Sequence, residues 1–259
     1  CGKLVGLEVF NPSRFALGLN PNIKLNGLGS GRKVYFGQNP QDSFQMNSPL
    51  KLFNETEINK MVSHNPELKK ILSDNKIPLR LNMTELQDLK TNHCQDTQDI
   101  ALAIAKNLPQ ALKQQVNIQD LKDGAILHDF GKVLIPPEIL NKNGALTDAE
   151  HKIMDLHTEL GYQLLKKSDV NGEVLDLVRY HHGANGKNYV PDVNVQILSL
   201  ADKYSALTEK RVYKEAFSPQ KALTIIYGDV KKGDVHPFIF NALVQAVQTG
   251  KISQNVNKY

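Results

Sequence analysis

Residues 121–139 read LKDGAILHDFGKVLIPPEI, and this stretch decides how the rest of the chain is interpreted. Apolar residues lead directly into His128 and Asp129, and two prolines follow near the end of the stretch. Adjacent side chains do not share one face of a regular helix, but both can reach one metal cluster from a helix's last turn. Gly131 is predicted to end that helix, because glycine adopts left-handed geometry without penalty. Lys132 then lies just beyond the helix, where it can meet an anion.

The chain has 259 residues, enough for a sizeable core, and its formal net charge at pH 7 is +4. This mild charge suits an acidic small substrate. No cluster of lysine and arginine is interleaved with aromatic residues, so a nucleic-acid duplex is not expected as a partner. No apolar run approaches the roughly 18–20 residues of a spanning helix, so no transmembrane segment is expected.

The chain has two cysteines, Cys1 and Cys94, and they provide no disulfide framework. A reducing compartment is therefore favoured, and the predicted location is the cytoplasm. Because the first residue is cysteine and not methionine, the chain is a fragment or a processed form. A fragment boundary is the preferred interpretation, and a lipid-anchored form that begins at Cys1 stays open.

The chain divides into four segments by composition. Residues 1–50 are rich in Gly, Asn, Pro and Ser without a sustained apolar period, which predicts an irregular or disordered leader. Residues 51–84 are predicted to be a helical lead-in, residues 85–250 the main domain, and residues 251–259 a polar tail. No strand pattern occurs in the two middle segments, so we predict an all-α bundle of roughly eight to ten helices.

Helix starts are marked by capping residues and prolines. Two capping-box signatures are present, Thr84-x-x-Gln87 and Thr147-x-x-Glu150. Each box predicts one long continuous helix, over about residues 84–108 and 147–167. Other helices are predicted to be capped by or to begin at Asn54, Pro66, Asn117, Glu173, Val193, Ser218 and Pro237.

Polar residues of one chemical kind recur at helix ends and on apolar helix faces. One histidine on an apolar face is more often a satisfied core residue, but five of the eight histidines lie in such places. Asp202 lies within the apolar run of residues 193–207, where a carboxylate costs several kcal/mol unless it is paired or bound to a metal. The collected candidates are His93, His128, Asp129, His157, His181, His182 and Asp202.

Imidazole and carboxylate ligands suit Fe, Mn, Zn or Co, and the lack of thiolate ligands argues against a structural zinc site. Seven ligands are too many for one ion, whereas two divalent ions that share the Asp129 carboxylate account for them. Two ions about 3.5–4 Å apart hold a bridging hydroxide and clamp an in-line displacement, which is the chemistry of phosphoester hydrolysis. Lys132 would neutralise a phosphate oxygen.

The order of these residues resembles the HD superfamily of metal-dependent phosphohydrolases. More narrowly, it resembles the HD-GYP branch, which comprises cyclic di-GMP phosphodiesterases of bacterial signalling. The resemblance covers roughly residues 85–248 and rests on four segments that match in order. They are ILHDFGKVLIPPEILNKNGALTDAE, the helix of His157, RYHH and ILSLADKYSALTEKRVYK. It implies an HD-domain helical bundle preceded here by an irregular N-terminal extension.

The resemblance also implies roles for individual residues. The family's metal ligands fall on the seven residues collected above, and Lys132, Arg211 and Lys214 would contact the phosphates of the substrate. Family members hold two or sometimes three metal ions, often iron or manganese, and the third uses a Glu one turn before the first His. Leu89 occupies that position here, so two ions are expected, with Fe or Mn preferred over Zn, Co or Ni.

The loop after His182 departs from the family pattern, which has a Glu and then a glycine-rich loop ending in Gly-Tyr-Pro. Gly183 replaces the Glu, and only Tyr189 remains of the tripeptide. We predict a cyclic di-GMP phosphodiesterase that uses a metal-bridging hydroxide, with Asp129 and Lys132 as catalytic residues. The alternatives are a phosphohydrolase of another nucleotide or phosphate ester, and a catalytically silent nucleotide-binding module. A homodimer is compatible with each of these.

Overall fold

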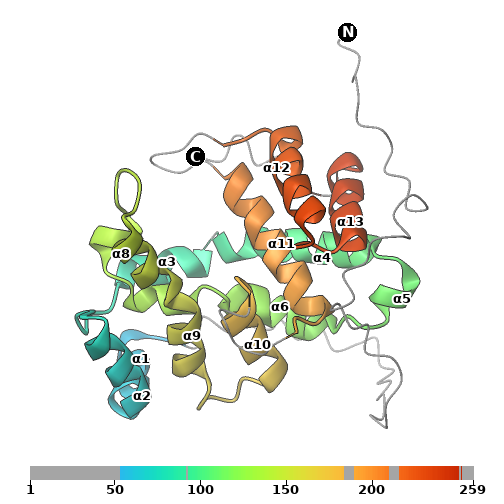
Figure 1. The fold of residues 1–259 in the computed structure, drawn as a ribbon. Coiled ribbons are helices and arrows are strands. Elements are labelled where there is room, and N and C mark those ends of the chain that lie inside the picture. Colours follow the sequence, from blue (N-terminus) through green and yellow to red (C-terminus); the bar gives the residue numbers. More distant parts are fainter. Residues whose placement is uncertain (1–52, 92, 184–189, 210–215, 251, 253–259) are drawn as a thin grey trace. The chain divides into compact units, whose positions relative to one another are not determined.

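The structure, a computed structural model, describes residues 53–91, 93–183, 190–209, 216–250 and 252 (Figure 1). Helices and turns are the only elements in these ranges, which confirms the predicted all-α class. The predicted leader lies outside the described residues, and so does the predicted tail apart from Ile252. Within the described ranges, no helix has both the length and the apolar character needed to cross a bilayer.

The described residues form thirteen α-helices and one 3-10 helix, more than the number expected. Among the additional helices, α5 and α7 are short, and α8 and α9 come from one predicted helix that is divided in two. The elements are α1 Glu55–Ser63, α2 Pro66–Asp74, α3 Met83–Thr91, α4 His93–Asn107, α5 Gln110–Lys113, α6 Ile118–Leu127, η3 Phe130–Leu134, α7 Pro137–Leu140, α8 Asp148–Asp155, α9 His157–Leu165, α10 Gly172–Tyr180, α11 Val193–Thr208, α12 Pro219–Lys232 and α13 Pro237–Gln248.

Most predicted helix starts are confirmed, because the local sequence satisfies the first backbone N–H groups. Asn54 caps α1 through a reciprocal capping box with Glu57, and Asn117 accepts hydrogen bonds from the first turn of α6. The predicted box of Thr147 and Glu150 opens α8. Helix α13 has the predicted bounds at both ends.

The capping box predicted at Thr84 is wrong. Helix α3 already begins at Met83, and the Glu85 N–H donates to the side chain of Asn82 at 3.1 Å. Asparagine is the stronger N-cap and lies two residues earlier, so it starts the helix first. The helix predicted over residues 84–108 corresponds to α3 and α4, and residue 92 between them lies outside the described residues.

The helix predicted over residues 147–167 is divided into α8 and α9. Leu156 lies between them with a φ of −67° and a ψ of −15°, which is close to 3-10 geometry. The apolar period continues through Leu156, so the sequence pattern does not reveal this break. His157 becomes the first residue of α9 and not a residue in the middle of a helix.

Two apolar clusters form the core of the described residues. One gathers side chains from α4, α6, α11, α12 and α13, and the other from α1, α2, α3, η3, α9 and α10. Helix α6 belongs to both, because Leu121 and Ala125 pack in the first cluster while Ile126 and Leu127 pack in the second. Figure 1 shows α6 beneath α4 and α11, with α9 and α10 on its other side. The last turn of α6 therefore lies where the two clusters meet.

Gly131 does not end a helix in left-handed geometry, so the prediction for this residue is wrong. It lies within η3, and it is not among the glycines with positive φ. A Cβ at this position would lie 1.9 Å from the carbonyl oxygen of His157 and 2.5 Å from the backbone nitrogen of Gly161. The glycine is needed because η3 crosses α9 backbone against backbone.

We expect Gly131→Ala to lower the free energy of unfolding by about 3 kcal/mol, the upper part of the usual range for an overpacked core. The added methyl meets backbone atoms, which cannot rotate away as a side chain can. Urea denaturation measures this change. Gly228→Ala in α12 is the control, because nothing lies within 4 Å of its added Cβ, and it should leave stability unchanged or raise it. Equal stability of Gly131→Ala and the unaltered protein would contradict this interpretation.

Candidate metal centre

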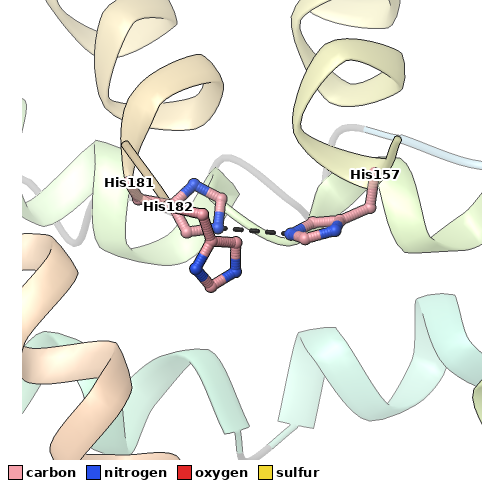
Figure 2. Close-up of side chains that lie close together, drawn as sticks. All are labelled: His157, His181 and His182. Atoms are coloured by element: carbon pink, nitrogen blue, oxygen red, sulfur yellow. Dashed lines mark hydrogen bonds between the residues drawn. The ribbon is translucent and has the colours of Figure 1, made fainter. Parts of the chain in front are cut away.

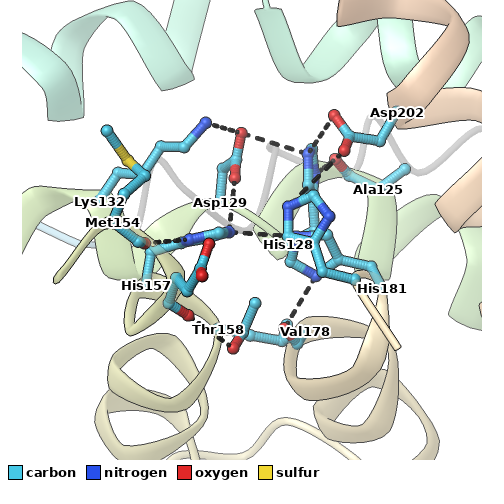
Figure 3. A network of polar contacts seen from close by, with 12 residues as sticks. Ala125, His128, Asp129, Lys132, Met154, His157, Thr158, Val178, His181 and Asp202 are labelled. Carbon is cyan, nitrogen blue, oxygen red and sulfur yellow. Dashed lines mark hydrogen bonds and ion pairs between the residues drawn. The ribbon is translucent and has the colours of Figure 1, made fainter. Parts of the chain in front are cut away.

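The predicted metal ligands gather where three helix ends meet α11 (Figure 3). Two residues follow the last turn of α6, one begins α9, two follow the last turn of α10, and one lies within α11. In that order they are His128, Asp129, His157, His181, His182 and Asp202. All are buried except His182, whose side chain is 46% exposed. The site is therefore closed on most sides and open beside His182.

Asp129 lies at the centre of the site, and its two oxygens face different partners. Its Oδ2 atom lies 3.3 Å from His128 Nε2, and its Oδ1 atom lies 3.4 Å from His157 Nε2. Lys132 Nζ also contacts Oδ2, at 2.6 Å. This carboxylate thus joins two histidines from different helices.

Asp202 forms a second connection across the site. Its Oδ1 atom lies 3.6 Å from His128 Nε2, and its Oδ2 atom lies 3.8 Å from His182 Nε2. Asp202 is 8% exposed and comes from an otherwise apolar helix. This buried carboxylate therefore has two histidines as neighbours, and its role as a metal ligand stays a prediction.

Three histidines are held in the same way by the backbone. The Nδ1 atoms of His128, His157 and His181 lie 2.8, 2.7 and 3.0 Å from carbonyl oxygens three residues earlier, those of Ala125, Met154 and Val178. A carbonyl oxygen only accepts, so each Nδ1 atom must carry the hydrogen. In a neutral ring the Nε2 atom then presents its lone pair to the centre of the site. This is the usual arrangement of a metal-ligating histidine.

Two of these lone pairs point at each other. His157 Nε2 and His181 Nε2 are 3.3 Å apart (Figure 2). With both Nδ1 atoms donating to carbonyls, this contact is a hydrogen bond only when one ring carries an additional proton. A metal ion between two neutral rings satisfies the same geometry. The donor set therefore fits a bound cation.

Two groups of residues can each hold a metal ion. One consists of His157, His181 and His182, and the other of His128, Asp129 and His181. The ligand atoms within each group lie within 4.8 Å of one another. The donors are imidazole nitrogens and carboxylate oxygens, which suit borderline divalent transition metals.

Burial and charge give these histidines different proton affinities. Burial lowers the pKa of His157 to about 4 and that of His181 well below its usual value, so both are neutral at pH 7. Burial also acts to lower the pKa of His128, but the carboxylates of Asp129 and Asp202 outweigh it and raise that pKa to about 10. A metal ion that binds His128 at pH 7 must therefore displace a proton.

Three predicted site residues are not placed. His93 is the first residue of α4, but its side chain lies outside the described part of the structure. Arg211 and Lys214 lie in residues 210–215, which are also outside the described ranges. Lys132 is described, and its ammonium group contacts Asp129. Its predicted contact with a phosphate stays a prediction.

Sequence reasoning missed the carbonyl partners that orient the three buried histidines. A usable signal existed, because each carbonyl belongs to the residue three positions before the histidine at a helix end. Sequence reasoning also missed the ion pair of Glu159 and Arg179, which joins α9 to α10 next to the site. No spacing rule within one helix identifies a pair formed between two helices.

Part of this chain is similar to a known protein family and to several named enzymes. Residues 91–207 match the family model described as the HD domain. The chain is 34% identical over 126 residues to "Cyclic di-GMP phosphodiesterase response regulator RpfG" of Xanthomonas campestris. The aligned region covers 44% of this chain and 32% of that protein. It is 34% identical over 165 residues to a "Cyclic di-GMP phosphodiesterase" of Vibrio cholerae. This aligned region covers 56% of this chain and 34% of that protein.

A third relative is named for a different nucleotide. The chain is 31% identical over 137 residues to "3'3'-cGAMP-specific phosphodiesterase 3" of Vibrio cholerae. The aligned region covers 49% of this chain and 29% of that protein. The chain thus spans about a third of the length of these three relatives.

We expect Asp129→Asn to abolish stoichiometric metal binding, because the amide removes the negative charge that faces two histidines. Metal content per chain, measured by mass spectrometry after loading and desalting, reports this loss. Asp229→Asn is a matched control, since Asp229 also pairs with a lysine, Lys203, but lies in α12. An Asp129→Asn protein with the full metal content would contradict the assignment of Asp129 as a ligand.

Proposed function

We propose that this chain, whose residues 91–207 match the HD-domain family model, is a metal-dependent phosphodiesterase that hydrolyses cyclic di-GMP. One observation carries the proposal: three buried imidazoles, each oriented through Nδ1, turn their Nε2 atoms toward one small region that also holds the carboxylates of Asp129 and Asp202. A buried centre of this kind has no use in a purely structural helix bundle, where apolar side chains of similar volume are at least as stabilising.

The proposed cofactor is a pair of divalent ions, with iron or manganese preferred. The two metal-binding groups share His181, and Asp202 and His93 would complete the coordination. When bound, such ions supply a nucleophile from water at neutral pH and stabilise charge on the phosphodiester. Asp129 is proposed to join the two sites, which its two oxygens favour because they already face different histidines.

Lys132 is proposed to bind a phosphate oxygen of the substrate. Burial opposes its charge, but the carboxylates of Asp129 and Asp202 outweigh burial and raise the pKa of Lys132, so it is protonated at neutral pH. An ammonium group has three donors, and the 2.6 Å contact with Asp129 Oδ2 uses one of them. The side chain is 18% exposed, which leaves the other donors able to meet an entering anion.

Cyclic dinucleotides are the proposed substrate class, because the relatives are named for cyclic di-GMP and 3'3'-cGAMP. Arg211 and Lys214 are proposed to bind the other phosphate. Gly183, which replaces the family's Glu, has a φ of 100° and leaves α10 in left-handed geometry that a Glu rarely adopts. The loop after the paired histidines therefore starts differently here, and 3'3'-cGAMP is the second candidate substrate.

The segment borders at residues 50, 84 and 250, a homodimer and a cytoplasmic location remain proposals that rest on the sequence.

The proposed activity is tested with the chain after it has been loaded anaerobically with iron or manganese. Cyclic di-GMP and 3'3'-cGAMP should be supplied separately, with linear products separated by chromatography. If protein with about two ions per chain hydrolyses neither nucleotide, the proposed activity is wrong.

We expect Lys132→Met to lower the turnover number by about 100-fold or more, the usual effect of removing one donor to a developing negative charge. Methionine keeps the apolar length of the side chain, and the metal content should stay unchanged. Single-turnover hydrolysis with metal counted on the same sample measures both quantities. If Lys132→Met changes only the unfolding midpoint and not turnover, Lys132 has a structural role and this part of the proposal is wrong.

A further inference from the structure

Helices α9 and α10 meet beside the metal centre, and an ion pair joins them there. Arg179 Nε lies 2.9 Å from Glu159 Oε2, and Arg179 Nη2 lies 2.9 Å from Glu159 Oε1. The two side chains are 21% and 22% exposed. A bidentate, partly buried contact between guanidinium and carboxylate fixes the distance and relative orientation of the two side chains better than a solvated surface pair does.

Further contacts hold each partner of this pair in place. The guanidinium carbon of Arg179 lies 3.9 Å from the centre of the Tyr162 ring, within cation–π distance. Gln163 Nε2 donates to Glu159 Oε1 at 3.0 Å. Because both side chains are already ordered, the ion pair loses less conformational entropy than a pair of free surface side chains.

The ion pair is within one helical turn of two metal ligands. Glu159 follows His157 by two residues, and Arg179 precedes His181 by two residues. The pair therefore connects the first turn of α9 to the last turn of α10. In the same region, a Cβ at Gly161 would lie 3.0 Å from Val178 Cγ1, so the helices already pack as closely as their side chains allow.

The two ligands do not hold themselves together. Their Nε2 atoms lie 3.3 Å apart, and each ring already uses its Nδ1 atom on a backbone carbonyl. Neither Nδ1 hydrogen is available to join the two rings, so the helices that carry them set their separation. The metal affinity of such a site depends on how closely its ligands keep the productive distance.

We propose that Glu159 and Arg179 are a positioning pair, which holds the imidazoles of His157 and His181 at the separation that a metal ion requires. This inference rests on the proposed function, since it needs a metal at the site. Neither residue ligates metal or contacts the reacting atoms. Both act through the placement of α9 against α10.

The test is a double-mutant cycle read on metal affinity and not on turnover. The variants are Glu159→Gln, Arg179→Met and the double substitution, each titrated with Co²⁺ while its visible absorption is recorded. We expect each single variant to bind the first Co²⁺ at least about 10-fold more weakly, the low end for a residue that orients a ligand. The double variant should bind Co²⁺ no more weakly than the single variants, because the same interaction is lost in all three.

Lys142→Met is the matched control. It removes a similar ion pair, that of Lys142 and Glu150 at 2.6 Å, which lies outside α9 and α10. Its Co²⁺ affinity should equal that of the unaltered protein. Thermal unfolding of every metal-free variant is measured in parallel, and if Arg179→Met does not fold, Glu159→Gln decides the question, since its amide keeps the size of the side chain.

Single variants that bind Co²⁺ as tightly as the unaltered protein would overturn the positioning pair, and so would affinity losses that multiply in the double variant. These results would leave the proposed function intact. Failure of the unaltered protein to bind any Co²⁺ would overturn both the proposed function and the positioning pair.

Discussion

The candidate centre depends on one repeated interaction, the hydrogen bond from a histidine Nδ1 atom to the carbonyl oxygen three residues earlier. His128, His157 and His181 all make it, at 2.7 to 3.0 Å. For His128 and His181 the carbonyl belongs to the end of a helix, where such groups lack a partner within the helix. The same bond therefore satisfies the backbone, fixes the ring and leaves Nε2 as the ligand atom.

Backbone packing then determines where these oriented rings meet. Helix α6 joins the two apolar clusters, and its end carries His128 and Asp129 to their junction. Gly131 lets η3 cross α9 so closely that Asp129 comes within 3.4 Å of the His157 ring. The charged and polar side chains are thus buried between the two apolar clusters, and their mutual contacts offset part of the cost of removing them from water.

The class of fold and most of the site followed from the sequence, because the information is local. Histidines at helix ends and Asp202 in an apolar helix identify themselves by spacing and composition. The division of the helix predicted over residues 147–167 did not follow, since the apolar period runs through Leu156 without a break. The need for a glycine at position 131 could also not be seen in the sequence, because the atoms that a side chain would meet there belong to the backbone of α9. Contacts between segments distant in sequence, such as that of Glu159 with Arg179, need the structure.

The most direct test of the central claim is a long-range ¹H–¹⁵N NMR spectrum of the histidine side chains, recorded without metal and with diamagnetic Zn²⁺. We expect His128, His157 and His181 to keep a protonated Nδ1 in the zinc-loaded protein, while their Nε2 resonances shift on binding. Coordination through Nδ1, or imidazole resonances that do not respond to the metal, would contradict it.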